Sequence, residues 1–315
     1  APPARPPRDL IKTQPAGIRL ATVVTLGRLG FVGTAGTDAA RLLNQPKRVA
    51  VLLYVMMSQR GGSLSRDQII GTFWPESDST RARNALRQSL SFLRSCLGAT
   101  AVVSIGSHGV AVAGSVECDA MRFEALLDAQ RKEEALSIYR GELLPGFHSG
   151  GSIAFTEWLD ARRQHLSQRA AKAAWDLSEE CEARGDLPGA AFWGKRALAL
   201  SPFSESEVQR LLRLLERVSD FAGALRAFHG LQHALATEFG SRPSAETARL
   251  VADIKRQIEA EGLHVPALLG TRRSDADRRV GQRRRSQAHW TGVERRGTAD
   301  RRTTGRRSGV DRRAI

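Results

Sequence analysis

Apolar residues recur at the spacing of an α-helix between Asp78 and Leu97, and this is the most regular pattern in the chain. Five of them are four, four, three and four positions apart and fall on one stripe: Ala82, Leu86, Leu90, Leu93 and Leu97. Asp78 or Ser79 can cap this helix, because its side-chain oxygen can accept a hydrogen bond from a free first-turn N–H. We expect Gly98 to end the helix in a left-handed conformation.

The polar side of this helix carries cations, amides and a hydroxyl but no acid from Thr80 to Leu97. Exposed helix faces usually mix Glu with Lys, whereas Arg, Asn and Gln are the side chains that pair with guanine and adenine edges. Seven residues are therefore candidates for contact with DNA: Arg81, Arg83, Asn84, Arg87, Gln88, Ser91 and Arg94. The alternative is a basic, solvated helix with no such contact.

The elements around this helix follow a recognisable order. Residues 18–32 are rich in β-branched side chains and predict short antiparallel strands, and Lys47 to Ser58 predicts a buried helix. Ser65 to Trp74 predicts a second helix, with Ser65 and Gln68 forming a capping box and Pro75 ending it. Val102 to Val112 predicts two strands around a turn, in which Ser107 and His108 are candidate wing contacts. Strands, two helices, a basic helix and a hairpin indicate a winged helix-turn-helix domain over residues 18–115.

Residues 116–261 predict an all-α domain with an internal repeat. Gly185-Asp186-Leu187 and Ser219-Asp220-Phe221 begin matching segments 34 residues apart, which is the period of tetratricopeptide (TPR) helix pairs. Such repeats present a groove for a peptide or for a second copy of the chain. Five aromatic residues either line that groove or belong to the core: Trp158, Trp175, Phe192, Trp193 and Phe228.

The net charge of +15 is unevenly distributed: +9 over residues 1–115, −4 over 116–261 and +10 over 262–315. Basic ends around a slightly acidic middle indicate a polyanionic partner for the ends. We expect residues 1–17 to form a disordered Pro/Arg-rich arm and residues 262–315 to form a disordered Arg-rich tail. Five tail residues are candidates for nonspecific phosphate contact: Arg283, Arg284, Arg285, Arg301 and Arg302. The alternative is a tail that only raises solubility.

Other chemistry has little support in the sequence. Three cysteines without a CxxC spacing argue against a disulfide framework or zinc site and fit a reducing cytoplasm. His229 and His233 lie one helical turn apart, but no third metal ligand is evident. The chain lacks P-loop, HExxH and GxSxG motifs, a membrane-length apolar run, and a signal-peptide core at its start. We therefore expect no enzymatic activity, no cofactor, no bound metal and no membrane contact.

The segment SRDQIIGTFWPESDSTRARNALRQSLSFLRSCLG resembles the OmpR/PhoB-type winged helix in the form joined to a bacterial transcriptional activator domain, as in antibiotic regulatory proteins. The similarity continues through Cys118-Asp119, Phe123-Glu124, ALSIYRGELLPGFH at 135–148 and Glu157-Trp158-Leu159, and covers about residues 18–258. Family wings often carry Gly-Tyr followed by Arg, whereas this turn is Ser107-His108-Gly109-Val110.

The resemblance implies a mainly α protein, in which a winged helix-turn-helix of α+β type precedes a TPR-like helical domain and a disordered basic tail. It implies a sequence-specific transcription regulator, most simply an activator, that binds direct repeats in promoter DNA. Its helical repeats would contact RNA polymerase, another regulator or a second copy of the chain. The alternative is a protein-interaction scaffold whose winged helix is vestigial.

Overall fold

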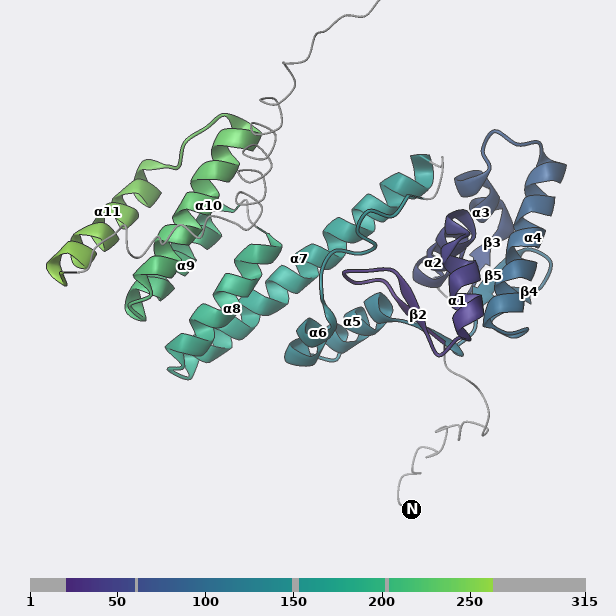
Figure 1. The fold of residues 1–315 in the computed structure, drawn as a ribbon, viewed down its shortest axis with the longest axis horizontal. Coiled ribbons are helices and arrows are strands. Elements are labelled where there is room, and N and C mark those ends of the chain that lie inside the picture. The colour runs from purple at the N-terminus through teal and green to yellow at the C-terminus, as the bar shows by residue number, and fades with distance from the viewer. Residues whose placement is uncertain (1–20, 60–61, 149–152, 202–203, 263–315) are drawn as a thin grey trace, which may run out of the picture. The chain divides into compact units, whose positions relative to one another are not determined.

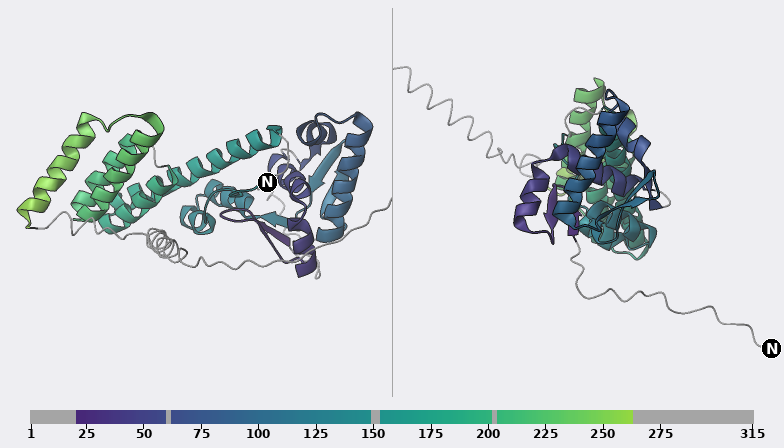
Figure 2. Two further views of the ribbon diagram at one scale, coloured as in Figure 1. Left: turned by 45° about the horizontal axis from the view of Figure 1, so that its top comes forward. Right: turned by 90° about the vertical axis from the view of Figure 1, so that its right-hand side faces the viewer.

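The computed structural model describes residues 21–59, 62–148, 153–201 and 204–262, which belong to one compact unit (Figures 1 and 2). We call residues 21–118 the head. Its elements are β1 (Ala21–Val24), β2 (Gly30–Val32), α1 (Gly36–Leu43), α2 (Pro46–Ser58), β3 (Leu64–Ser65), α3 (Arg66–Phe73), α4 (Ser79–Leu97), β4 (Val102–Ile105), β5 (Gly109–Val112) and β6 (Val116–Cys118).

We call residues 119–262 the helical part. Its elements are α5 (Asp119–Asp128), α6 (Lys132–Ile138), α7 (Ile153–Ala183), α8 (Leu187–Leu200), α9 (Glu205–Arg217), α10 (Phe221–Phe239) and α11 (Ala245–Ala260). The long helix α7 runs from beside α3 to its antiparallel neighbour α8, and α9, α10 and α11 follow as further stacked helices (Figure 1). The described residues are mainly helical and their strands lie in the head, as the sequence predicts.

Two three-stranded sheets build the head. In the first, β1 lies between antiparallel β2 and parallel β6, with Thr22 opposite both Val32 and Glu117. In the second, β5 lies between β3 and β4, and the β4–β5 hairpin is the predicted wing. The predicted antiparallel strands at 18–32 and the hairpin at 102–112 are confirmed. The sequence did not predict β3 or β6, and β6 adds residues beyond the expected boundary at 115 to the head sheet.

The helices of the head follow the predicted apolar pattern, with three differences. Ser65 Oγ accepts a hydrogen bond from the Gln68 N–H at 3.2 Å, but the Gln68 side chain lies toward the Tyr54 hydroxyl, so only half of the capping box forms. Gly98 has φ of 109° and ψ of 149°, a positive φ outside the left-handed helical region, so that detail of our prediction is wrong. The short helix α1 is an additional element, and its fully buried residue is Leu42.

The start of α5 holds the β1–β2 hairpin to the helical part. One carboxylate, that of Asp119, accepts hydrogen bonds from the Thr25 N–H at 2.8 Å, the Thr25 hydroxyl at 2.6 Å and the Leu26 N–H at 3.0 Å. The loop after α6 also reaches this hairpin, and Gly27 donates its N–H to the Glu142 carbonyl at 2.8 Å. A Cβ on Gly27 would lie 3.0 Å from the Arg140 carbonyl oxygen, so glycine is required at this close approach.

An aromatic cluster connects α7 to the helix-turn-helix. Tyr54 of α2 contacts Trp158 of α7 with ring centroids 5.0 Å apart and Phe73 of α3 at 5.6 Å. Phe73 in turn contacts Phe155 of α7 at 5.2 Å. Trp158 therefore packs against the head rather than lining a groove between repeats. This contact fixes α2 and α3, the helices that support α4.

The 34-residue period has a direct structural meaning. Asp186 and Asp220 cap α8 and α10, and each accepts a hydrogen bond from the N–H of the glycine three residues later, at 2.9 Å for Gly189 and 2.8 Å for Gly223. A Cβ on Gly189 or Gly223 would lie against a carboxylate oxygen of the capping aspartate as that side chain is placed here. The glycine therefore leaves space for this placement of the carboxylate, whereas the equivalent cap of α4 by Asp78 accommodates Arg81. The repeated motif begins the second helix of two successive pairs, as in a helical repeat.

Candidate nucleic-acid interface

Helix α4 has the buried and exposed sides that the sequence predicts. The Asp78 carboxylate caps it by accepting a hydrogen bond from the Arg81 N–H at 2.9 Å. Four of the five predicted apolar residues are buried, and the fifth, Leu97, is half-buried. Six of the seven candidate DNA contacts are exposed: Arg81, Arg83, Asn84, Arg87, Gln88 and Ser91. The exposed side of the helix therefore carries cations, amides and a hydroxyl, and its apolar side packs into the head.

Hydrogen bonds organise part of this polar face before any partner binds. The Arg87 guanidinium donates to Asn84 Oδ1 at 3.2 Å, and the Arg81 guanidinium lies 3.1 Å from an Asp78 carboxylate oxygen. The first contact leaves the Asn84 amide NH2 and most of the Arg87 donors available. The second pairs two well-exposed side chains, so it holds Arg81 only weakly.

A cleft separates α4 from α3 and the turn of the wing. Its volume is about 460 Å³. Its lining contains four predicted contacts from two separate stretches of sequence: Arg83, Arg87, Ser107 and His108. The wing turn therefore lies across the cleft from the middle of α4, although the two are about twenty residues apart in sequence.

Arg66 also lines this cleft, and the sequence reasoning did not include it among the candidate contacts. Its guanidinium donates to Ser104 Oγ of β4 at 2.8 Å, and its N–H bonds the His108 carbonyl at 2.8 Å. The sequence could have indicated Arg66, because it directly follows Ser65, the cap of α3, and this position places a long cation at the start of a helix. Arg66 thus adds a third arginine to the cleft while it supports the wing.

The three arginines that line the cleft have no carboxylate partner among the described residues. Arg66, Arg83 and Arg87 form no ion pair with any residue that the structure describes. One carboxylate, that of Asp67, also lines the cleft, and His108 lies at its wing side. An excess of unpaired cations around an open cleft favours an anionic ligand such as the phosphate backbone of DNA.

Arg94 differs from the other six candidates on α4. Its Nε–H donates to the Val102 carbonyl at 2.7 Å, and a second guanidinium nitrogen lies 3.4 Å from Ser104 Oγ. Its side chain is half-buried by these contacts. In this structure Arg94 therefore ties the end of α4 to strand β4 and sets the position of the wing.

A second group of cations lies on aromatic rings at the edge of the head. The guanidiniums of Arg41 and Arg48 lie 5.4 Å and 4.4 Å from the centroid of Phe92, and the Lys47 ammonium lies 5.0 Å from that of Trp74. Burial lowers the pKa of Lys47. These contacts cover apolar rings and pack α1 and α2 against their neighbours, so they serve the fold of the head.

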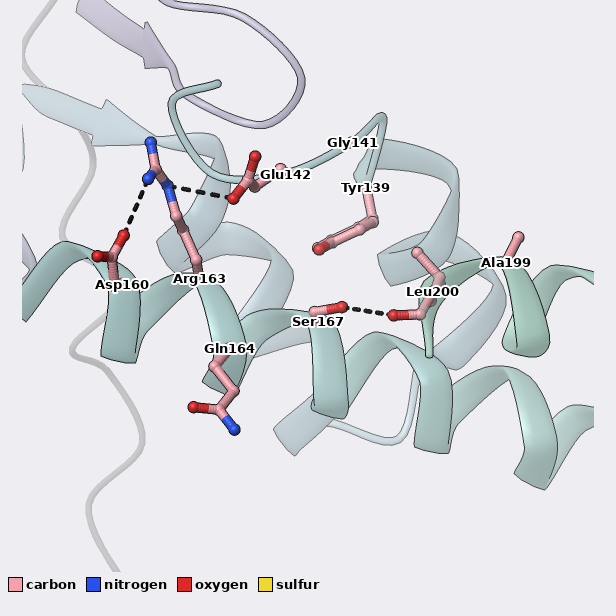
Figure 3. A pocket seen from close by; sticks show the side chains of 9 residues that line it. All are labelled: Tyr139, Gly141, Glu142, Asp160, Arg163, Gln164, Ser167, Ala199 and Leu200. Atoms are coloured by element: carbon pink, nitrogen blue, oxygen red, sulfur yellow. Dashed lines mark hydrogen bonds and ion pairs between the residues drawn. The ribbon is translucent and has the colours of Figure 1, made fainter. Parts of the chain in front are cut away.

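The helical part contains a larger cavity of about 560 Å³ between the loop after α6, α7 and the end of α8 (Figure 3). Its side chains largely pair with one another. Arg163 lies 3.0 Å from Asp160 and 3.4 Å from Glu142, and it donates to the carbonyls of Leu143 and Leu144. Ser167 donates to the Leu200 carbonyl at 2.8 Å. The side chains around this cavity therefore hold the loop after α6 against α7.

The five tail arginines and residues 1–20 lie outside the described residues. Among those that are described, no three His, Cys, Asp or Glu side chains are grouped so that they could hold a metal ion. No helix in the same part of the chain combines the length and apolar character that crossing a membrane requires.

Comparisons with known proteins give two findings. Residues 117–255 match the family model described as the bacterial transcriptional activator domain. The fold is similar to that in a structure of Mycobacterium tuberculosis EmbR in complex with a low-affinity phosphopeptide, with a TM-score of 0.51 and 20% sequence identity over 85% of this chain and 71% of that one. A search of curated proteins gives no match. The chain therefore contains a bacterial transcriptional activator domain at residues 117–255.

Proposed function

We propose that this protein is a sequence-specific DNA-binding regulator of transcription, with α4 as the recognition helix in the major groove. The observation that carries this proposal is the cleft in which Arg66, Arg83 and Arg87, all without ion-pair partners among the described residues, face the wing turn. The activator domain in the same chain supplies the context of transcription.

Some residues of the interface would contact base edges, and others would contact the DNA backbone. Asn84, Arg87 and Gln88 project from the exposed face of α4 and have the hydrogen-bonding groups that pair with adenine and guanine edges. Arg81 and Arg83 lie nearer the start of the helix, where phosphate contacts are common. Ser107 and His108 would contact the backbone from the wing, with fewer charges than a wing that carries arginine.

A single head reads few base pairs, so we propose that two copies bind direct repeats in a promoter. Residues 116–261, which contain nearly all of the helical part, have a net charge of −4, so this region is poorly suited to lie on DNA. Its role would be contact with a second copy, with RNA polymerase or with another regulator. We place this DNA-bound role in the cytoplasm of a bacterial cell.

Fluorescence anisotropy of labelled duplexes over a salt series tests DNA binding directly. We expect a steep fall of log affinity with log salt, which Arg83→Ala should make shallower by about one ion because we assign Arg83 to a phosphate contact. Arg122→Ala is the matched control, because Arg122 is an exposed arginine on α5, away from the cleft. A weak, salt-independent response of the unmodified protein would instead favour the alternative, a protein-interaction scaffold with a vestigial winged helix.

The arrangement of sites is tested with the unmodified chain on duplexes that carry two copies of its preferred half-site. We expect cooperative filling when two direct repeats are about 10–11 base pairs apart, because both heads then lie on one side of the duplex. Adding about half a helical turn should abolish the cooperativity. Equal cooperativity at both spacings would show that contact between adjacent copies is not the cause of the cooperativity.

A further inference from the structure

The wing carries an exposed apolar side chain next to its turn. Ile105, the last residue of β4, is 51% exposed, and β4 is the edge strand of the second head sheet. The residue opposite Ile105 in the hairpin is Gly109. A Cβ on Gly109 would lie 2.8 Å from the Ile105 carbonyl oxygen, so glycine is required there, and no cross-strand side chain covers Ile105. The exposure of Ile105 therefore follows from the geometry of the hairpin.

Contacts with α3 and α4 brace the strand that carries Ile105. The Ser104 hydroxyl accepts hydrogen bonds from the guanidiniums of Arg66 at 2.8 Å and Arg94 at 3.4 Å. Because side chains alternate along a strand, Ser104 points toward these arginines and Ile105 points to the opposite face of the wing. A β-branched side chain has few rotamers, so Ile105 forms a fixed apolar projection on that face.

The cations of the cleft indicate where this projection would lie on DNA. Arg66, Arg83 and Arg87 have no carboxylate partner among the described residues, and they favour a phosphate strand in the cleft between α4 and the wing turn. In B-DNA the sugar–phosphate backbone separates the major groove from the minor groove. With α4 in the major groove and the backbone in the cleft, the far face of the wing would lie over the adjacent minor groove.

The tip of the wing has no strong charge with which to enter that groove. From Val103 to Val110 the sequence contains no Lys, Arg, Asp or Glu. Proteins also enter the minor groove with apolar side chains, isoleucine among them, which separate two stacked base pairs and kink the duplex. A neutral tip with a braced, exposed isoleucine fits this mode of contact.

We propose that Ile105 inserts between base pairs in the minor groove beside the half-site and bends the DNA there. Pyrimidine–purine steps such as TA and CA unstack most easily, so Ile105 would create a preference for such a step at a position that α4 does not touch. This inference rests on the proposed function, because it requires α4 to occupy the neighbouring major groove. It adds a bend and a step preference that the hydrogen-bonding residues of α4 do not supply.

Energy transfer between dyes at the two ends of a duplex that carries the preferred half-site measures the bend produced by the full chain. We expect a bend of about 20° or more with the parent and the loss of most of it with Ile105→Ala. Affinity should fall by less than about tenfold, because the cost of unstacking disappears together with the contact. Val32→Ala is the matched control and should leave the bend unchanged, because Val32 is a β-branched residue of a head strand that is 58% exposed and does not line the cleft.

A second measurement varies the DNA, so it does not depend on the stability of a variant. The base step beneath the wing is changed from TA to CA and to the middle of an A-tract. The parent should bind the TA and CA duplexes roughly threefold to tenfold more tightly than the A-tract duplex, because A-tracts are stiff. Ile105→Ala should bind all three duplexes equally, and Ile105→Val, which keeps a shorter β-branched side chain, should retain part of the preference.

Three results would overturn the inference: a bound duplex that the parent does not bend, equal bending by the parent and Ile105→Ala, or equal affinity of the parent for the three duplexes. Circular dichroism establishes that each variant is folded. The salt dependence of the same complexes separates this failure from a failure of the proposed function. A steep dependence that Arg83→Ala makes shallower supports DNA binding even if Ile105 has no role, whereas a flat dependence of the parent overturns both.

Discussion

The head and the helical part use their charged residues in opposite ways. In the described head, both ion pairs join neighbours within one helix, Arg41 with Asp38 and Arg81 with Asp78. The helical part also has ion pairs within one helix, such as Arg163–Asp160, but here other arginines and lysines join different helices: Arg162–Glu124, Arg210–Glu179, Arg217–Glu182, Lys195–Asp220 and Arg213–Glu246. The same residue types therefore hold helices together in one region and remain available for a ligand in the other. Net charge alone would not have shown this difference.

The largest effect should come from the apolar base of the head. Leu90 is 2% exposed beneath the polar face of α4, so Leu90→Ala should lower the free energy of unfolding of the head by about 2–5 kcal/mol. Urea denaturation followed by circular dichroism measures this change, and DNA binding should fall in step with the folded fraction. Gln88→Ala, on the exposed side of the same helix, should change stability by no more than about 0.5 kcal/mol. Equal stability of the two variants would show that the buried stripe is wrongly assigned.

The next effect concerns the unpaired polar face. Asn84→Ala and Arg87→Ala should each weaken binding to a preferred site by about 1–3 kcal/mol and relax one base position. Because their side chains hydrogen-bond to each other at 3.2 Å, the double variant should lose less than the sum of the two. Binding selections with randomised duplexes measure the base preference. Equal losses on specific and random DNA would restrict both residues to phosphate contact.

A smaller effect should come from the caps of the helical repeats. Gly189→Ala and Gly223→Ala bring a Cβ against the capping aspartate, so each should cost about 0.5–2 kcal/mol of stability. Gly230 of α10 is the matched control, because a Cβ there meets nothing within 4 Å. Gly230→Ala should stabilise the protein by up to about 1 kcal/mol through helix propensity. Thermal unfolding should therefore give opposite signs for the two kinds of position, and a common sign would contradict the role of the caps.

The smallest effect should come from a partly exposed ion pair of the helical part. Burial alone would raise the pKa of Asp220, but hydrogen bonds from Lys195 and from the Gly223 N–H outweigh it and leave this pKa lowered. A carboxyl with a lowered folded-state pKa stabilises the protein above its unfolded-state pKa, and this contribution disappears as the pH falls through the folded-state value. Asp220→Asn keeps a capping side chain without the charge, so the parent should be more stable by about 0.2–1 kcal/mol at pH 7. The difference in stability between the parent and Asp220→Asn should vanish in acid. A difference in stability that does not change with pH would instead come from the cap alone.

Local patterns in the sequence were sufficient for much of this fold. The spacing of apolar residues gave α4 and α2, the turn residues gave the wing hairpin, and the 34-residue period gave the two capped helices. Strands β3 and β6 were missed because two or three residues carry no periodicity and form only against a distant partner. Helix α1 was missed because it lacks a side-chain cap and buries a single residue completely.

The same limit applies to the candidate site. The exposed face of α4 follows from helical spacing, but the inclusion of Arg66 and the use of Arg94 as a brace depend on where the wing packs. Spacing within one helix cannot predict a contact with a strand that follows after a turn.

The pairing of β1 with β6 also determines when the head can fold during synthesis. The first strand finds its parallel partner only after the chain has reached Val116, and the Asp119 carboxylate that holds the hairpin comes later still. Helix α4 and the β4–β5 hairpin therefore leave the ribosome before the sheet of β1, β2 and β6 is complete. Contacts between residues so distant in sequence form slowly, and domains generally fold as units during synthesis. A nascent chain halted before residue 119 should thus lack a completely folded head, so the DNA binding that we propose would arise only once the helical part has begun to emerge.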